Sequence, residues 1–181
     1  MPFLPSLRAG ASLLDVFKMF PEASKPLIEF HEALLRGPSP FTEAERELIA
    51  AYVSRLNQCR YCHGVHTATA ERLGIPQDAV QKLMDGAETS DVPKKMKTVL
   101  QYAQKLTESP AGVSQADAAA VLAVGWNETA LYHTVAVTAL FNLMNRLVEG
   151  LGIELDPAYV RPAAQRLADR GYLPLLEMIK R

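Results

Sequence analysis

Both cysteines of this 181-residue chain, Cys59 and Cys62, lie in one short stretch, and His66 follows them one helical turn later. Two residues between cysteines is the spacing of a redox-active dithiol or of half a zinc site. On an α-helix, positions i, i+3 and i+7 share one face, so the two sulfurs and the imidazole are expected in one column. The stretch from Glu47 to His66 is therefore where we look for chemistry.

Cysteines in the first turn of a helix meet unpaired backbone N–H groups and the positive end of the helix dipole, which stabilise a thiolate. The pKa of a thiol, about 8.5 when free, can fall by one to several units at such a position. His66 can hydrogen-bond to the sulfur of Cys62, and Glu47 can accept the other imidazole proton if the two helices are antiparallel neighbours. Such a relay would combine a nucleophile, a base and a residue that orients the base.

Spacing alone leaves three interpretations open: a redox dithiol, part of a zinc site, and two buried cysteines without chemical function. The two cysteines, His63 and His66 cannot all converge on one ion, because positions i to i+7 span about 10 Å along a helix. Only His31 and His133 remain elsewhere in the chain. The sequence therefore offers no second ligand cluster to complete a tetrahedral zinc site.

The scaffold is predicted to be all-α, because no segment shows sustained alternation of β-branched residues between turn signals. We predict a single domain over residues 1–181, with an N-terminal arm (1–11), a helical core (about 24–153) and C-terminal helices (157–181). Capping residues, prolines and glycines delimit the helices. The expected starts are Ser12, Ser24, Thr42, Cys59, Pro76, Ser90 or Asp91, Ser114, Asn127 and Asp156, with a last short turn after Gly171.

The helix that begins at Thr42 carries its main apolar face on Leu48, Ile49 and their helical neighbours. Glu47 lies on the opposite side, beside alanines and Ser54, so the pattern alone indicates an exposed charge. Those small neighbours would also let another helix approach closely, and a helix that is apolar on one side and small on the other is often sandwiched. The long helix after Asn127 is apolar nearly all round, which predicts a central position or a subunit interface.

Composition narrows the classes of function. The formal net charge is −1 and there is no Lys/Arg-rich run, which argues against nucleic acid or an anionic membrane as the main partner. We see no signal peptide, and no apolar stretch approaches the ~18 residues of a membrane span. Two cysteines do not make a disulfide-stapled secreted fold, and a lone Cys-x-x-Cys in a reducing compartment favours catalysis or metal binding, so a cytoplasmic location is expected.

At these residues the sequence resembles the AhpD-like alkylhydroperoxidases of the carboxymuconolactone decarboxylase superfamily. The family signature is Glu, eleven residues, Cys-x-x-Cys, three residues, His, and it falls without a gap on Glu47, Cys59, Cys62 and His66. The context SPFTEAERELIAAYVSRLNQCRYCHGVH, with the later ALFNLMNRLVEGLGI, is similar to the branch labelled "peroxidase-related". The resemblance extends roughly over residues 31–153.

The resemblance implies an all-helical, homo-oligomeric thiol peroxidase that reduces alkyl hydroperoxides or hydrogen peroxide without metal, haem or flavin. It implies that Cys62 attacks the peroxide and becomes a sulfenic acid, which Cys59 resolves to a disulfide. His66 and Glu47 would activate Cys62, and a lipoyl-type or other dithiol donor would reduce the disulfide. A general thiol–disulfide oxidoreductase and a redox-switch binding protein are the alternatives, whereas the superfamily's decarboxylase chemistry does not call for a Cys-x-x-Cys.

One position departs from the family pattern. The best-known member has a histidine directly before the second cysteine, where this chain has Tyr61. The role of that histidine, which assists the first cysteine, therefore does not transfer. His63, directly after Cys62, is a candidate to replace it.

Overall fold

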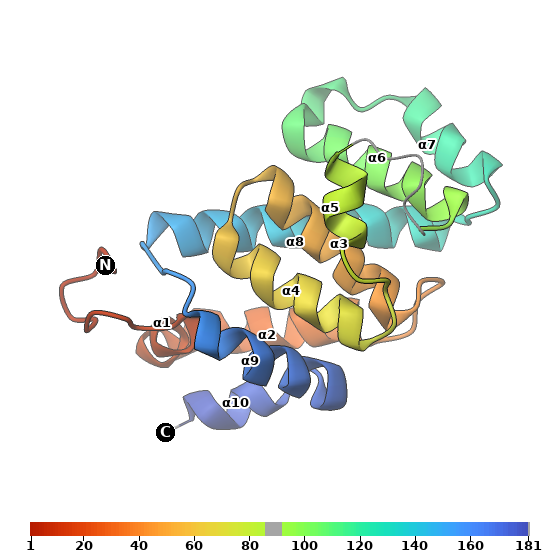
Figure 1. Cartoon of the computed structure of the whole chain (residues 1–181). Helices are drawn as coiled ribbons and strands as arrows, with labels where there is room; N and C mark the ends of the chain where they lie inside the picture. Colours follow the sequence, from red (N-terminus) through yellow and green to blue (C-terminus); the bar gives the residue numbers. More distant parts are fainter. Residues whose placement is uncertain (86–91, 181) are drawn as a thin grey trace.

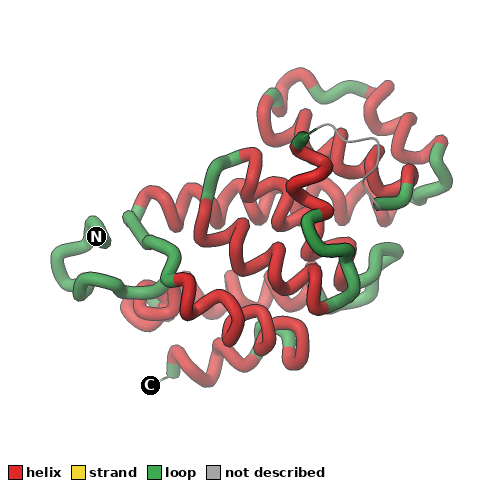
Figure 2. The backbone as a smooth tube through the Cα atoms, viewed as in Figure 1, coloured by secondary structure: helices red, strands yellow, loops and turns green. Residues whose placement is uncertain are grey.

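The computed structural model describes residues 1–85 and 92–180, and every regular element within these ranges is helical (Figure 1). The all-α prediction is thus confirmed for the described part of the chain. Figure 2 shows helices joined mainly by short loops, with a longer irregular arm at the N-terminus. The elements are α1 (Leu13–Met19), α2 (Pro21–Leu35), α3 (Glu43–Leu56), α4 (Arg60–Arg72), α5 (Ala79–Met84), α6 (Lys94–Glu108), a 3₁₀ turn (Pro110–Gly112), α7 (Gln115–Ala123), α8 (Glu128–Gly150), α9 (Pro157–Arg170) and α10 (Pro174–Ile179).

Side-chain caps explain several of the helix starts. The hydroxyl of Thr42 accepts a hydrogen bond from the backbone N–H of Glu45 (3.2 Å), and the Glu45 carboxylate accepts one from the backbone N–H of Thr42 (2.8 Å). This reciprocal capping box satisfies N–H groups that the first turn leaves unpaired. Ser114 makes the same kind of box at α7, and Asn127 caps α8 through its side-chain oxygen. The predicted starts of these three helices are confirmed.

Two predicted starts are wrong. α2 begins at Pro21 rather than at Ser24, because proline lacks the N–H that the first helical position leaves unpaired anyway. α5 begins at Ala79 rather than at Pro76, because Asp78 has a left-handed backbone (φ 60°) that separates Pro76 from the helix. The predicted caps at Ser90 or Asp91 lie outside the described residues, and α6 begins at Lys94, directly after Pro93.

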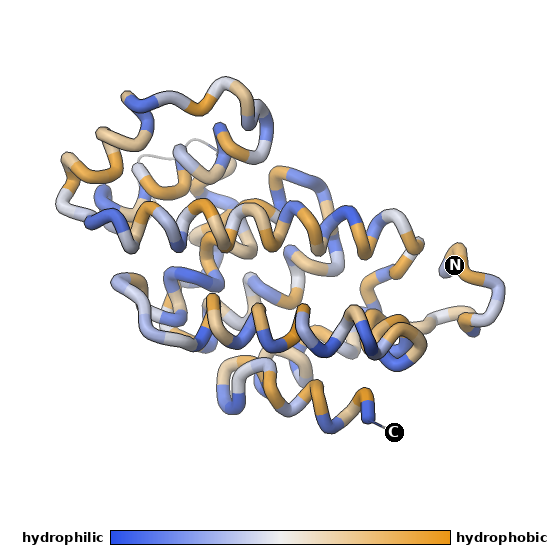
Figure 3. Tube along the Cα trace, turned by 180° about the vertical axis from the view of Figure 1, so that it is seen from behind, coloured by the Kyte–Doolittle hydropathy of each residue, from blue (hydrophilic) through white to orange (hydrophobic). Residues whose placement is uncertain are grey.

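α3 lies in the middle of the structure, packed most extensively on α4 and also on α6 and α8 (Figure 1). Every residue from Arg46 to Ser54 is buried, which confirms that α3 is sandwiched. α9 covers α4 from its other side, and α1, α2 and α10 pack together beside it. Figure 3, the view from behind, shows the long helix α8 alternating between apolar and polar positions along its length.

α8 confirms the prediction of a central helix, since ten of its residues are buried and it contacts α2, α3, α4, α6 and α7. Two large apolar side chains on its outer side, Tyr132 and Leu143, are more than half exposed at 61% and 51%. Among the described residues, no helix has the length and apolar character needed to cross a membrane.

Candidate active site

α3 and α4 form an antiparallel hairpin that brings together the two halves of the predicted signature. The carboxylate oxygen Oε2 of Glu47 lies 2.7 Å from Nδ1 of His66, and the carbonyl of Ala51 lies 3.2 Å from Nδ1 of His63. The earlier residue of α3, Glu47, thus contacts the later residue of α4, His66, and the later residue of α3, Ala51, contacts the earlier residue, His63. This is the pattern of two antiparallel helices. The side of α3 that carries small residues faces α4, so that the two helix axes can approach closely.

Glu47 is completely buried, and the interpretation of this residue as an exposed charge is therefore wrong. Periodicity failed here because α3 has no solvent-facing side. Burial alone would raise the pKa of the Glu47 carboxyl, but the charges and hydrogen bonds of His66 and Arg36 outweigh burial and lower this pKa. Glu47 is accordingly an ionised carboxylate held inside the protein.

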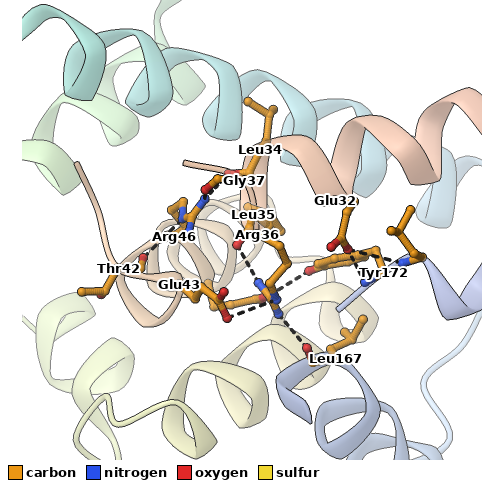
Figure 4. Close-up of polar contacts among 12 residues, drawn as sticks. Glu32, Leu34, Leu35, Arg36, Gly37, Thr42, Glu43, Arg46, Leu167 and Tyr172 are labelled. Atoms are coloured by element: carbon orange, nitrogen blue, oxygen red, sulfur yellow. Dashed lines mark hydrogen bonds and ion pairs between the residues drawn. The ribbon is translucent and has the colours of Figure 1, made fainter. Parts of the chain in front are cut away.

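The second carboxylate oxygen of Glu47 is held by two residues that the sequence did not single out. Oε1 accepts hydrogen bonds from Nη2 of Arg36 (2.7 Å) and from the hydroxyl of Tyr172 (2.9 Å). Arg36 directly follows α2 and also donates to the carbonyls of Leu35 and Leu167, as Figure 4 shows. Tyr172 lies in the turn between α9 and α10. No sequence signal pairs residues 36, 47 and 172, because their meeting depends on tertiary packing.

Both cysteines are reduced and buried at the start of α4. Cys59 is the N-cap residue of the helix, and Cys62 lies in its first turn, as predicted. The expected fall in the thiol pKa is not found. A hydrogen bond to the sulfur of Cys59, together with burial, raises the pKa of Cys62 well above its ordinary value, and a hydrogen bond from Asn145 opposes this only in part. In this closed arrangement Cys62 is a protonated thiol that needs a base.

The turn that carries the cysteines is tied to α8 by a network of amides. Nδ2 of Asn57 donates to the side-chain oxygens of Asn145 (2.9 Å) and Asn142 (3.1 Å), and Asn145 donates to the hydroxyl of Ser54 (3.0 Å). Between Asn57 and Cys59, Gln58 adopts a left-handed backbone with φ 58°. Asn145 was not among the predicted site residues, although an asparagine on a helix that is mostly apolar was the available signal.

The structure brings Glu47 to His66, and Cys59 to Cys62, but it does not join these two pairs directly. Within the described part of the chain, the hydrogen bonds of Cys62 involve Cys59 and Asn145, and none reaches His66. The imidazole of His66 packs with its edge toward Phe141, with ring centroids 4.5 Å apart. A proton relay from Cys62 to His66 therefore remains a prediction, to be completed by a water molecule or a small shift of the thiol.

Among the hollows that border α4, two reach the residues of the signature. A cavity of about 70 Å³ next to His66 is lined mainly by apolar residues of α1, α2, α4, α8, α9 and α10, and it includes Tyr61. The ring of Tyr61 stacks on Tyr159 with centroids 6.0 Å apart, and burial raises the pKa of Tyr61. On the other side, a hollow of about 440 Å³ is bordered by Cys59 and His63. His63 thus lies beside the first cysteine, where the candidate replacement for the missing histidine was expected.

Two histidines lie apart from the cysteines. His31 donates from Nδ1 to the carbonyl of Leu27 (2.7 Å) and packs against Tyr172, and burial lowers its pKa to about 4. His133 on α8 is buried as well. Residues 1–85 and 92–180 contain no group of three or more His, Cys, Asp or Glu side chains arranged to hold a metal ion.

Comparison with known proteins gives a family match for part of the chain. Residues 21–105 match the model of the carboxymuconolactone decarboxylase family, a range that contains Arg36 and the whole signature but not Tyr172. No curated protein matched the chain.

Solved structures resemble most of the fold. An uncharacterized peroxidase-related protein from Silicibacter sp. TM1040 is similar with a TM-score of 0.75 and 24% identity, covering 81% of this chain and 77% of that one. A peroxidase-related protein with an alkylhydroperoxidase AhpD core, from Ralstonia eutropha JMP134, gives 0.74 and 24%, covering 80% and 76%. A protein of unknown function from Agrobacterium tumefaciens, named as a candidate antioxidant defence protein AhpD, gives 0.71 and 15%, covering 81% and 99%.

The family match covers the hairpin that carries the signature, and the similar structures extend the likeness to about four-fifths of the chain. Residues 21–105 are thus similar to the carboxymuconolactone decarboxylase family, and the all-helical fold of the chain resembles that of the AhpD-like, peroxidase-related structures.

Proposed function

We propose that the protein is a thiol peroxidase that reduces organic hydroperoxides or hydrogen peroxide with the dithiol of Cys59 and Cys62. The observation that carries this proposal is the buried 2.7 Å hydrogen bond between Glu47 and His66, which lies one helical turn from a reduced cysteine pair. A structural pair of cysteines would not need an ionised carboxylate buried behind a histidine, since burying a charge is costly. A base and its orienting residue are what a protonated Cys62 requires.

The proposed reaction has two steps. His66 takes the proton of Cys62, and the thiolate attacks the nearer peroxide oxygen, which breaks the O–O bond and leaves a sulfenic acid on Cys62 and an alkoxide that gains a proton to become the alcohol. The sulfur of Cys59 then attacks the sulfur of Cys62, forming the disulfide and releasing water. An external dithiol, for example a lipoyl group, restores the two thiols by exchange.

A direct experiment measures thiol loss when the reduced protein meets cumene hydroperoxide. The wild type should lose two thiols per chain. Cys59→Ser should stop at a sulfenic acid on Cys62, detectable by dimedone and mass spectrometry, and Cys62→Ser should be inert. If the wild type reacts no faster than free cysteine, the peroxidase proposal fails. Matched melting curves of the three proteins control for misfolding.

One observation favours a second candidate, a general thiol–disulfide oxidoreductase. Cys59 borders the larger hollow, whereas the pKa of Cys62 is raised by Cys59 and by burial. Both cysteines are buried, but the hollow beside Cys59 gives a disulfide partner a route to that residue, which favours thiol–disulfide exchange over attack on peroxide by Cys62. Slow reaction with peroxide combined with fast exchange against lipoamide would select this candidate. In both cases we propose that the protein acts in a reducing compartment such as the cytoplasm and as a homo-oligomer.

The oligomer part of the proposal rests on the resemblance to the family, and the exposed apolar side chains Tyr132 and Leu143 on the outer side of α8 are candidates for its contact surface. Analytical ultracentrifugation of the wild type tests this part separately from the chemistry.

A further inference from the structure

The carboxylate of Glu47 is shared between two different sets of partners. Oε2 faces His66, whereas Oε1 accepts hydrogen bonds from Arg36 and Tyr172. Neither Arg36 nor Tyr172 belongs to the Glu–Cys–Cys–His signature, and Tyr172 lies far outside the residues that match the family model. All four side chains are at most one-tenth exposed, so that water does not replace these contacts.

The charge on Glu47 decides which nitrogen of His66 can act as a base. An ionised carboxylate only accepts hydrogen bonds, so His66 must donate from Nδ1, and whenever the ring is neutral its lone pair is then on Nε2. A protonated Glu47 could instead donate to Nδ1, and the ring proton would then sit on Nε2. Only the first arrangement leaves Nε2 able to take a proton, and two donors at Oε1 favour it because they stabilise the ionised carboxylate.

We propose that Tyr172 is a positioning residue of the active site, which together with Arg36 holds Glu47 ionised and thereby keeps the lone pair of His66 on Nε2. The proposal rests on the proposed function for its catalytic meaning, but its chemical content, the tautomer of His66, does not depend on turnover. The proposal links the turn between α9 and α10 to the chemistry of the α3–α4 hairpin, since Tyr172 lies 125 residues after Glu47.

The backbone conformation around Tyr172 fixes the position of its side chain. Gly171 has φ 67° and ψ −155°, a conformation essentially restricted to glycine. A Cβ atom on Gly171 would come within 2.7 Å of Oε2 of Glu32. That same oxygen accepts hydrogen bonds from the backbone N–H groups of Tyr172 (2.7 Å) and Leu173 (3.3 Å), as Figure 4 shows for Glu32 and Tyr172. The turn therefore fixes where the phenol enters.

The phenol itself is suited to act as a permanent donor. Burial raises the pKa of Tyr172 well above its ordinary value, so the hydroxyl keeps its proton. Its ring lies against Arg36, whose guanidinium carbon is 5.1 Å from the ring centroid. The titratable groups that interact electrostatically with Glu47 come from α2, α3, α4 and the α9–α10 turn, and they are His31, Arg36, Arg46, His66 and Tyr172.

The test compares Tyr172→Phe with Tyr52→Phe. Both substitutions remove only a hydroxyl from a buried tyrosine, but the hydroxyl of Tyr52 donates to the neutral side chain of Gln104 (3.0 Å) on the far side of α3. The first readout is ¹⁵N NMR of the imidazole of His66, assigned by its loss in His66→Gln. We expect the wild type and Tyr52→Phe to keep the neutral ring with its proton on Nδ1, and we expect Tyr172→Phe to admit the form with a protonated Glu47 and the ring proton on Nε2 at a pH about one unit higher than the wild type does as the pH is lowered.

The second readout is the pH profile of the reaction of Cys62 with cumene hydroperoxide. Tyr172→Phe removes one hydrogen bond to the charged Glu47. The pH below which the reaction rate falls should therefore be about one unit higher in Tyr172→Phe than in the wild type. The rate should then fall on the order of tenfold at pH 5 and stay within about twofold at pH 8. Tyr52→Phe should keep the wild-type profile. A purely structural tyrosine would lower the melting temperature without moving the profile.

The outcomes separate this proposal from the proposed function. An unchanged His66 tautomer and an unchanged profile in folded Tyr172→Phe would overturn the role of Tyr172. If the wild type is inert to peroxide, the proposed function fails while the tautomer result still stands. If Tyr172→Phe does not fold, Arg36→Lys provides the second variant. Lysine keeps the positive charge but lacks the guanidinium group that donates to Glu47 and to the carbonyls of Leu35 and Leu167. This variant should also admit the form of His66 with its proton on Nε2.

Discussion

The two ends of the reactive face of α4 are held in opposite ways. At the His66 end, Glu47 and its donors Arg36 and Tyr172 form short contacts of 2.7–2.9 Å around an ionised group. At the cysteine end, two neutral sulfurs sit behind a turn that is held by neutral amides and contains the left-handed Gln58. The His66 end is thus held by hydrogen bonds to an ionised group, whereas the cysteine end is held by hydrogen bonds between neutral groups, which are weaker.

This difference matches what each end would have to do in a peroxidase. A base works best in one orientation, so rigidity at His66 is useful. The sulfurs have to change partners, because Cys62 leaves the hydrogen bond with Cys59, reacts, and then bonds to Cys59 covalently with the narrow geometry of a disulfide. We therefore expect changes at the two ends to differ in kind, which the following predictions test from the largest expected effect to the smallest.

The largest effect should come from removing the base. His66→Gln should lower the rate of Cys62 oxidation by cumene hydroperoxide roughly 10²- to 10⁴-fold at neutral pH, the usual range for a general base. His63→Gln, at the cysteine end and bonded to Ala51, should lower it by less than about tenfold on the same scale. Stopped-flow measurement of thiol loss compares the two variants directly. Equal losses would break the distinction between the ends.

The second prediction concerns stability at the His66 end. Arg36→Met should destabilise the fold by about 3–5 kcal/mol, because it leaves the charge of Glu47 buried without its cationic partner. The double variant Arg36→Met/Glu47→Gln should recover part of that loss, since the buried charge is gone. Lys105→Met, which removes a more exposed ion pair with Asp117, should cost much less than Arg36→Met, because solvent screens exposed charges. Urea unfolding followed by circular dichroism measures all three, and a loss below the Lys105→Met value for Arg36→Met would contradict the charge-held description.

The sequence predicted the two ends unequally, for physical reasons. Local rules placed α3, α4, α7 and α8, because caps such as Thr42 and Asn127 act within four residues. Helical spacing also placed Cys62 and His66 on one face. Glu47 was misread as exposed, because periodicity reports on one helix and cannot show that α3 is covered on all sides.

The remaining partners could not be found from local rules at all. Arg36, Asn145 and Tyr172 reach the site from three other parts of the chain, and their contacts join residues that are 11, 91 and 125 positions apart in sequence. The expected low pKa of Cys62 failed for a related reason: the helix start was predicted correctly, but the burial and the Cys59 contact that raise this pKa are tertiary features.

The third prediction uses His31, which packs against Tyr172 at the His66 end. Burial lowers the pKa of His31 from 6.5 to about 4, so between these values the unfolded chain binds a proton that the folded chain does not. Stability should therefore fall as the pH is lowered through this window, by about 2 kcal/mol between pH 7.5 and pH 5 from this residue. Urea titrations at the two pH values should show that His31→Phe loses that part of the dependence. An unchanged difference in His31→Phe would mean that this end is more open to water than the structure indicates.

The smallest effect should come from the turn that carries the cysteines. Gln58 has φ 58°, which costs a residue with a Cβ atom about 1–2 kcal/mol, and glycine relieves this at an entropic cost of about 0.5–1 kcal/mol. Gln58→Gly should therefore stabilise the fold by no more than about 1.5 kcal/mol. It should leave the rate of sulfenic acid formation on Cys62 unchanged while altering the rate of disulfide closure, which mass spectrometry of quenched samples separates. Asp78→Gly relieves a similar backbone (φ 60°) away from the cysteines and should change neither rate. If Gln58→Gly slows both steps alike, the turn positions Cys62 as firmly as Glu47 positions His66, and the contrast between the two ends disappears.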